Sequence, residues 1–141
     1  MKPHEGHAST VELSHDECLG LLASVNVGRI AWVFDDTPHI LPVNHRMLRH
    51  QVVIRTGIES QLARQAVGAP VAFEVDDVDY GRLTGWSVVV NGICRPVDEV
   101  ALPPDTLTPW VRGAKAQVLA IEPTSITGRR LVEQAADSDD S

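Results

Sequence analysis

Several features that define large classes of proteins are scarce in this 141-residue chain. Only two cysteines, Cys18 and Cys94, are present, which is too few for a disulfide framework, so we expect a reducing compartment, the cytoplasm. The apolar runs are short, as at 88–90, and none approaches the roughly 20 residues that a membrane-spanning helix needs. Residues 1–10 are polar and do not resemble a secretory leader. We therefore expect no membrane partner.

Basic residues are also scarce relative to acidic ones. The chain has 12 lysines and arginines against 19 aspartates and glutamates, which gives a formal net charge of -7. Because proteins that bind nucleic acid usually present a basic surface, we expect no nucleic-acid partner. Among the basic residues only Lys2 and Lys115 are lysines. Arginine suits bidentate binding of phosphate or carboxylate, and a coding bias toward arginine is the alternative explanation.

The motifs of several well-known catalytic and binding sites are missing from the sequence. No serine lies in a Gly-x-Ser-x-Gly turn, and neither a P-loop nor a Gly-x-Gly-x-x-Gly pattern occurs. The two cysteines lack the spacing of a zinc site. We therefore predict no catalytic side chain and no metal site, and we expect a small molecule as the ligand.

The residues that are present fit one globular domain. Hydrophobic residues make up 43% of the chain and charged residues 22%, which is ordinary for a folded protein. We predict a single domain over residues 12–133, a disordered lead over residues 1–11 and an acidic disordered tail over residues 134–141. A helix is expected from Ser14 to about residue 25, because Ser14 and Glu17 match a capping box and apolar residues then recur at helical spacing.

Short strands account for most of the remaining pattern. We expect strands at 29–34, 39–48, 51–56, 70–76, 86–97, 116–122 and 125–132, with short helices at 59–67 and 106–111. Gly92 inside a strand indicates a bulge or bend, and Pro42 indicates an edge, a bulge or a ladder position that needs no donor. Strands and helices do not alternate regularly, so the sequence predicts a mainly β, antiparallel barrel or sandwich.

The segment 55–62 is the most suggestive binding site. A strand ends in Arg55 and Thr56, and a short helix begins directly after Ser60. Free backbone amides, two hydroxyls and a guanidinium are together able to hold a phosphate group. The alternative interpretation is ordinary helix capping beside a surface arginine.

Five blocks of sequence carry a resemblance to a known family. The blocks run from Leu13 to Ala31, Pro38 to Asn44, Val53 to Leu62, Val71 to Gly92 and, more weakly, Pro109 to Arg130. Their order and spacing resemble the pyridoxamine 5′-phosphate oxidase-like family of flavin-binding split β-barrels. The similarity is greatest to the actinobacterial branch of small proteins related to nitroimidazole-resistance reductases. It covers about residues 12–131, nearly the whole predicted domain.

The resemblance implies a six-stranded, Greek-key-like antiparallel split β-barrel that forms a homodimer and binds FMN between its two subunits. It places the backbone of four residues along the flavin ring: Pro42, Val43, Asn44 and His45. It places five residues around the FMN phosphate: Arg55, Thr56, Ser60, Gln61 and Leu62. It brings three further residues to the flavin from the partner subunit: Trp86, Ser87 and Trp110. For Trp86, packing in the core or at the dimer interface is the alternative.

Gln61 departs from the family pattern, in which many flavin-binding relatives have lysine after the serine. A hydrogen bond from a charged donor contributes roughly 1.5–3 kcal/mol, against roughly 0.5–1.5 kcal/mol from a neutral one. The exchange of lysine for glutamine is therefore expected to weaken phosphate binding by about 1 kcal/mol. Deazaflavin, haem or no cofactor at all are the alternatives to FMN. The chain also lacks the long C-terminal substrate motif of true pyridoxamine phosphate oxidases.

Two classes of function follow from the resemblance. The first is an FMN-dependent oxidoreductase that passes electrons from a reduced nicotinamide to a small acceptor such as a nitroaromatic or a quinone. The flavin supplies the redox chemistry in such an enzyme, so no catalytic side chain is required. The second is a non-catalytic module that binds or sequesters a flavin, a deazaflavin or haem. A dimer that has lost its cofactor site is a third possibility, for which Gln61 is the only indication.

Overall fold

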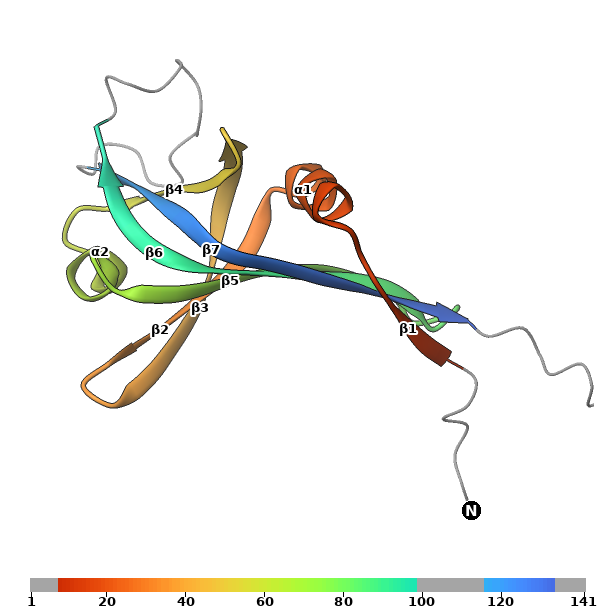
Figure 1. The fold of residues 1–141 in the computed structure, drawn as a ribbon. Helices are drawn as coiled ribbons and strands as arrows, with labels where there is room; N and C mark the ends of the chain where they lie inside the picture. The colour runs from red at the N-terminus through yellow and green to blue at the C-terminus, as the bar shows by residue number, and fades with distance from the viewer. Residues whose placement is uncertain (1–7, 99–115, 134–141) are drawn as a thin grey trace, which may run out of the picture.

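The structure, a computed structural model, describes residues 8–98 and 116–133, which form seven strands and two helices (Figure 1). In chain order these are β1 (Ala8–Glu12), α1 (His15–Ser24), β2 (Val27–Phe34), β3 (Thr37–Leu48), β4 (Gln51–Gly57), α2 (Gln61–Ala66), β5 (Pro70–Asp79), β6 (Thr84–Val97) and β7 (Ala116–Glu133). The fold is mainly β, as the sequence predicts. The helix expected at 106–111 lies outside the described residues.

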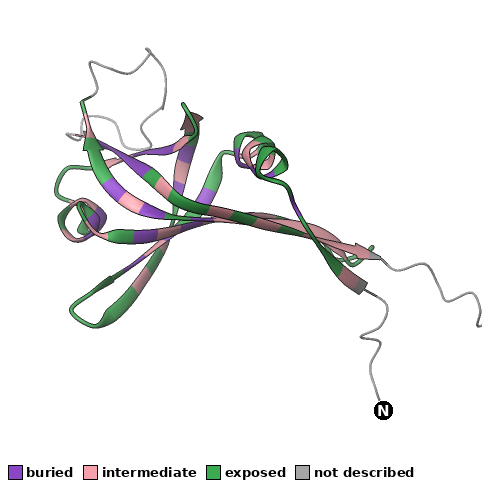
Figure 2. Cartoon of the chain, in the orientation of Figure 1, coloured by how far each residue is buried: buried purple, intermediate pink, exposed green. Residues whose placement is uncertain are grey.

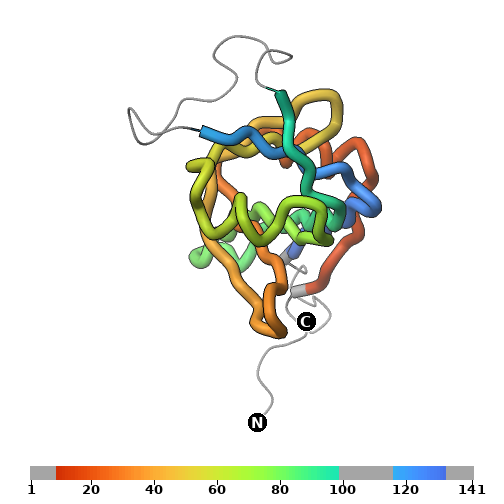
Figure 3. The backbone as a smooth tube through the Cα atoms, turned by 90° about the vertical axis from the view of Figure 1, so that its left-hand side faces the viewer, coloured from red at the N-terminus to blue at the C-terminus, as the bar shows by residue number. Residues whose placement is uncertain are grey.

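All strand pairings in the described part of the chain are antiparallel. The strand order is β1-β7-β4-β3-β2-β5-β6, and an additional pairing of β6 with β7 closes six of the strands into a ring. The ring is visible in Figure 3, which is turned by 90° from Figure 1. The predicted antiparallel barrel of six strands is therefore confirmed, and β1 is a seventh strand added to the outer side of β7.

Three strands extend beyond the ring. β2 pairs with β5 only as far as Glu74, whereas β5 and β6 stay paired as far as Asp79 and Thr84. β7 and β1 continue the same sheet on the other side of β6. We call this extension, which consists of residues 75–79, 84–88, 128–133 and β1, the arm; it points away from α2 in Figure 1.

The N-terminal segment differs from the prediction. Residues 8–11 belong to β1, where the sequence indicates a disordered lead, and Ala8 pairs with Glu133 at the far end of the chain. The prediction is wrong for these residues because their pattern is short and polar. These residues are ordered by their backbone pairing with β7. Local sequence does not reveal which distant residues a strand pairs with.

The C-terminal strands also differ. The sequence predicts two strands with a break around Pro123, but β7 is continuous over Ala116–Glu133. The register of β6 against β7 shifts between Asn91 and Gly92, because Asn91 pairs with Ser125 and Gly92 pairs with Pro123, which leaves Thr124 as the extra residue on β7. The bulge expected at Gly92 is therefore confirmed. It accommodates Pro123, which is the registered partner of Gly92 and has no backbone N–H to donate.

Helix α1 begins as its sequence predicts. Ser14 Oγ accepts a hydrogen bond from the Glu17 backbone N–H at 3.1 Å, and Glu17 Oε1 accepts one from the Ser14 N–H at 2.9 Å. These two bonds make the capping box. Cys18 and Leu22 on the inner face of the helix are buried, so α1 closes one side of the barrel.

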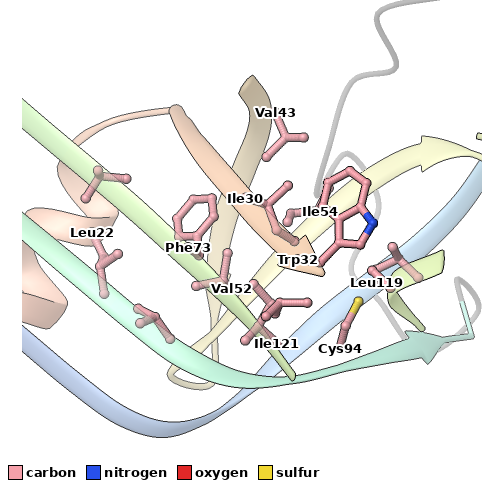
Figure 4. Close-up of a cluster of buried hydrophobic side chains, with 14 of the residues drawn as sticks. Leu22, Ile30, Trp32, Val43, Val52, Ile54, Phe73, Cys94, Leu119 and Ile121 are labelled. Atoms are coloured by element: carbon pink, nitrogen blue, oxygen red, sulfur yellow. The ribbon is translucent and has the colours of Figure 1, made fainter. Parts of the chain in front are cut away.

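The hydrophobic core fills the inside of the barrel (Figure 4). Its largest buried side chains come from β2, β4, β5, β7 and both helices, and Trp32 Nε1 donates to Gln65 Oε1 of α2 at 3.0 Å. Both cysteines are free and buried. Burial raises the pKa of the Cys94 thiol to about 11, so it behaves as a small hydrophobic residue. Most buried positions lie in the barrel, and the arm is largely intermediate or exposed (Figure 2).

Candidate functional site

The end of β4 and the start of α2 form a compact polar corner. Thr56 Oγ1 donates a hydrogen bond to Ser60 Oγ at 3.0 Å, and the Ala63 backbone N–H donates to the same oxygen at 3.0 Å. The Ser60 N–H donates to the Gly57 carbonyl at 2.9 Å and closes the turn. Because the Ser60 hydroxyl already accepts two hydrogen bonds, its own proton is directed toward a further acceptor. An anion is a suitable acceptor.

The sequence-predicted phosphate residues fall into two groups in this corner. Arg55, Thr56 and Ser60 are half-buried, and Gln61 is the exposed first residue of α2. These four residues are neighbours. Leu62 is different, since only 1% of it is exposed and it packs in the core. It anchors α2 to the barrel and is not available to a ligand.

A second arginine that the sequence analysis does not single out lies near Arg55. Arg46 is exposed on β3 and is the registered partner of Val53 on β4, two residues before Arg55. Side chains two residues apart in a strand share a face, and cross-strand partners do so as well. Arg46 and Arg55 are therefore diagonal neighbours on the outer face of the barrel. The signal in the sequence is the two-residue turn at 49–50, which fixes this register.

The predicted ring-binding stretch of β3 alternates between the core and the outside. Val43 and His45 are buried, Pro42 is exposed and Asn44 is half-buried. The pairing of β4 with β3 runs from His45 to Leu48 and does not include Pro42, so the missing backbone donor of this proline disturbs no bond to β4. The prediction for Pro42 is thus confirmed. Only the backbone of this stretch and its outward side chains are placed to line a ligand.

His45 is a structural residue. Its Nε2 lies 2.9 Å from the Leu22 carbonyl oxygen, and its ring meets Phe73 edge-on with centroids 4.8 Å apart. Since a carbonyl only accepts, Nε2 carries the hydrogen. Burial lowers the pKa of His45 and so favours the neutral ring, although hydrogen bonds to the backbone of Leu22 and Asn26 act in the opposite direction. The side chain fastens α1 to β3, and its contribution to a ligand is limited to its backbone.

Trp86 and Ser87 lie on the arm and point to opposite faces of β6. Trp86 is half-buried and packs against the core cluster, and its strand position places it on the same face as Val88. Ser87 lies on the outer face, in register with Asp76 and Arg129. A ligand that lies on one face of the arm thus meets the side chain of only one of these two residues. Trp110 lies outside the described residues.

A cavity of about 400 Å³ opens on the inner face of the arm. Its polar and aromatic lining comes from Asp77, Asp79, Arg82, Thr84, Trp86 and Arg130. The arm and the polar corner formed by β4 and α2 lie at opposite ends of the molecule in Figure 1. A single chain thus does not bring Trp86 together with the predicted phosphate residues.

The outer face of β2 and β5 carries a cluster of three charged side chains, Arg29, Glu74 and Asp76. Arg29 Nη1 lies 3.3 Å from Glu74 Oε1 and 3.2 Å from Asp76 Oδ2, so one guanidinium serves two carboxylates. Partial burial and the neighbouring Asp76 carboxylate raise the pKa of Glu74 from its ordinary 4.5 to about 7, although Arg29 lowers it. The raised pKa shifts Glu74 toward its protonated form near neutral pH, compared with an ordinary exposed glutamate.

This raised pKa predicts a specific pH dependence of stability. Between pH 4.5 and about 7 the folded chain binds the Glu74 proton more tightly than the unfolded chain, so stability falls as the pH rises through this range. We expect Glu74→Gln to remove that decline. Urea unfolding of both proteins at several pH values between 4.5 and 8 measures it, with Glu12→Gln on the exposed edge strand β1 as the control. A constant difference between wild type and Glu74→Gln across the range contradicts the assignment.

Comparison with known proteins places this geometry in a family. The sequence profile described as pyridoxamine 5′-phosphate oxidase matches residues 14–130. An uncharacterized protein of Mycobacterium tuberculosis is 42% identical over 130 residues, which cover 86% of each chain. The chain belongs to the pyridoxamine 5′-phosphate oxidase family, as the resemblance implies.

Solved structures agree with this assignment. A protein of Mycobacterium smegmatis described as an FAD binding protein is 35% identical, with a TM-score of 0.70 over 86% of this chain and 98% of its own. A conserved protein of unknown function from Corynebacterium diphtheriae is 30% identical, with a TM-score of 0.72 over 87% of this chain and 98% of its own. In the described part of the chain, α1 and α2 are both too short to cross a bilayer.

Proposed function

We propose that this protein is a flavin-dependent oxidoreductase that binds the flavin phosphate at the polar corner of β4 and α2. The observation that carries the proposal is the Ser60 hydroxyl, which accepts hydrogen bonds from Thr56 and Ala63 and so directs its own proton to an anion beside Arg55. Membership of the pyridoxamine 5′-phosphate oxidase family supports a flavin as the source of that anion.

The residues present fit a phosphate group. The Arg55 guanidinium supplies a planar pair of donors and a full positive charge, and the Ser60 hydroxyl supplies one further donor. Gln61 adds a neutral donor from the first turn of α2. We infer that the outward backbone of Pro42 to Asn44, next to Arg55 on the barrel surface, lines the ring. A flavin held by these residues would supply hydride and electron transfer from a reduced nicotinamide to a small acceptor.

The protein is proposed to act as a homodimer in the cytoplasm. Exposed large hydrophobic residues gather at the end of the arm, where Tyr80 is 82% exposed and Val78 and Leu83 are also exposed, and a second group lies on the β2–β3 hairpin. Such surfaces indicate contact with another protein chain. A two-fold partner is also what brings one chain's arm to the other chain's polar corner. Sedimentation at micromolar concentration tests this, and a monomer contradicts it.

FMN is the expected cofactor, and FAD is a second candidate that two observations favour. The 35% identical protein of M. smegmatis is described as FAD binding. In addition, Arg46 lies diagonal to Arg55, and two arginines on one face suit the two linked phosphates of FAD better than the single phosphate of FMN.

The test is a visible absorption spectrum of the purified protein, followed by titrations with FMN and FAD. Saturation at low micromolar flavin, and then oxidation of a reduced nicotinamide with a nitroaromatic or quinone present, are the expected results. A flavin that binds without turnover favours the non-catalytic binding module instead. A colourless protein that binds neither flavin refutes the proposal and makes deazaflavin, haem or no cofactor the leading alternatives.

A further inference from the structure

The inner face of the arm presents a row of three different side chains across neighbouring strands. Asp77 of β5 is the registered partner of Trp86 of β6, which in turn is the registered partner of Arg130 of β7. Cross-strand partners project to the same face. The row therefore places an indole between a carboxylate and a guanidinium, whose backbones are two strand spacings, or about 10 Å, apart.

The row forms part of the wall of the 400 Å³ cavity, which is within the size range of small-molecule sites. The Trp86 side chain is partly buried and packs against the hydrophobic core, which restricts its movement. Arg130 has no hydrogen bond or ion pair to another residue of the described ranges, and it acts on Glu17 of α1 only through a weaker electrostatic effect that lowers the pKa of that carboxyl. The guanidinium is thus placed to bind something from outside the chain.

Of the two other charged side chains that line the cavity, Asp79 is engaged in a turn, and the turn uses only the backbone N–H of Arg82. Asp79 Oδ1 accepts hydrogen bonds from the backbone N–H groups of Gly81 at 3.0 Å and Arg82 at 3.1 Å. These bonds hold the turn at the end of the arm. Asp77 and Arg130 are the acceptor and the donor next to the indole, because they are its registered partners on the two neighbouring strands.

We propose that this row is the binding platform for the ring of the substrate. The ring is planar and stacks on Trp86, with a hydrogen-bond donor at the edge facing Asp77 and a carbonyl or carboxylate acceptor at the edge facing Arg130. This inference rests on the proposed flavin function. In the proposed dimer, the platform of one chain faces the flavin that the second copy holds. A ring that carries only hydrogen-bond acceptors, such as a simple nitroaromatic or quinone, would place an acceptor opposite the Asp77 carboxylate. Such a ring is expected to bind less tightly than one with a donor at that edge.

Three small probes separate the features of this platform. 4-Aminobenzoate carries a donor and an acceptor at opposite edges of one ring, benzoate carries the acceptor alone and aniline carries the donor alone. Each is titrated by calorimetry or by NMR shifts into the full-length protein, both free of flavin and loaded with it. We expect 4-aminobenzoate to bind at least fivefold more tightly than either of the other two, and to bind equally well in both states.

Variants test the named residues. Arg130→Gln is expected to lower the affinity for 4-aminobenzoate at least fivefold and to change the affinity for aniline less than twofold. Asp77→Asn is expected to lower the affinity for aniline without lowering the affinity for benzoate. Arg129→Gln is the matched control, because the adjacent arginine projects from the other face of β7, and it should change each affinity less than twofold. Circular dichroism and the melting temperature identify any variant that misfolds, and the other variant then decides.

Several results overturn the platform. These are equal affinities for the three probes, equal effects of Arg129→Gln and Arg130→Gln, or the absence of saturable binding. Displacement of 4-aminobenzoate by bound flavin also overturns it, because the cavity then belongs to the flavin. The experiment on flavin-free protein keeps the two proposals separate: if no flavin binds at all, the flavin function fails while the probe titrations still support or refute the platform.

Discussion

Replacement of Arg55 by alanine is expected to weaken flavin binding at least tenfold. The guanidinium is the one full positive charge in the group of Arg55, Thr56, Ser60 and Gln61, and hydrogen bonds to charged groups contribute about 1.5–3 kcal/mol. A loss of about 1.4 kcal/mol corresponds to a factor of ten in the dissociation constant. Titration of wild type and Arg55→Ala with FMN and with FAD, followed by absorption or fluorescence, measures the change.

Two further variants test whether the loss of affinity is specific to Arg55. Arg64→Ala removes an exposed arginine from the last turn of α2 and should leave the affinity within twofold. Gln61→Lys adds a charge next to Ser60 and should tighten binding several-fold, since charged donors exceed neutral ones by about 1 kcal/mol. An Arg55→Ala protein that binds flavin as wild type does would show that the phosphate lies elsewhere.

Replacement of Gly92 by alanine is expected to lower the free energy of unfolding by about 1–3 kcal/mol, the range for overpacking a filled interior. A Cβ at this position would collide with the Glu122 carbonyl oxygen and would lie 2.8 Å from Ile121 Cγ2 and 2.9 Å from the Glu122 carbonyl carbon. Two of these atoms belong to the backbone of β7, so relief requires movement of the β6–β7 ladder. That ladder closes the barrel.

The control is the same substitution where space is open. A Cβ at Gly20, on the exposed side of α1, meets nothing within 4 Å. Gly20→Ala is therefore expected to stabilise the protein by roughly 0.5–1 kcal/mol, because alanine loses less conformational freedom in a helix than glycine. Urea unfolding of both variants gives the two values. If both substitutions change stability by similar amounts in the same direction, the close packing at the β6–β7 bulge does not control the fold.

Part of the fold could be predicted from local sequence. Ser14 and Glu17 mark the start of α1 because a capping box uses residues three apart. Gly92 marks the bulge because a missing Cβ is required where two backbones approach. In contrast, β1 has no such mark. Its order depends on pairing with residues 129–133, and a pairing over that chain distance leaves no local pattern.

The candidate site divides in the same way. Arg55, Thr56 and Ser60 are within six residues, so the sequence is sufficient to group them. The sequence does not separate the ligand-facing residues from those that hold the fold. Leu62 and His45 fall in the second class because their side chains are buried, which depends on how α1 and α2 pack on the barrel.

By itself the sequence determined that this is a mainly β member of the pyridoxamine 5′-phosphate oxidase family, and it predicts a single domain with an anion-binding segment at residues 55–62. These properties are carried by residue spacing along one chain segment at a time. Only the tertiary structure decided that Arg46 joins Arg55, that Trp86 and Ser87 face apart, and that Asp77, Trp86 and Arg130 form one row. Each of these depends on strand register, because a shift of one residue in a pairing moves every side chain to the opposite face.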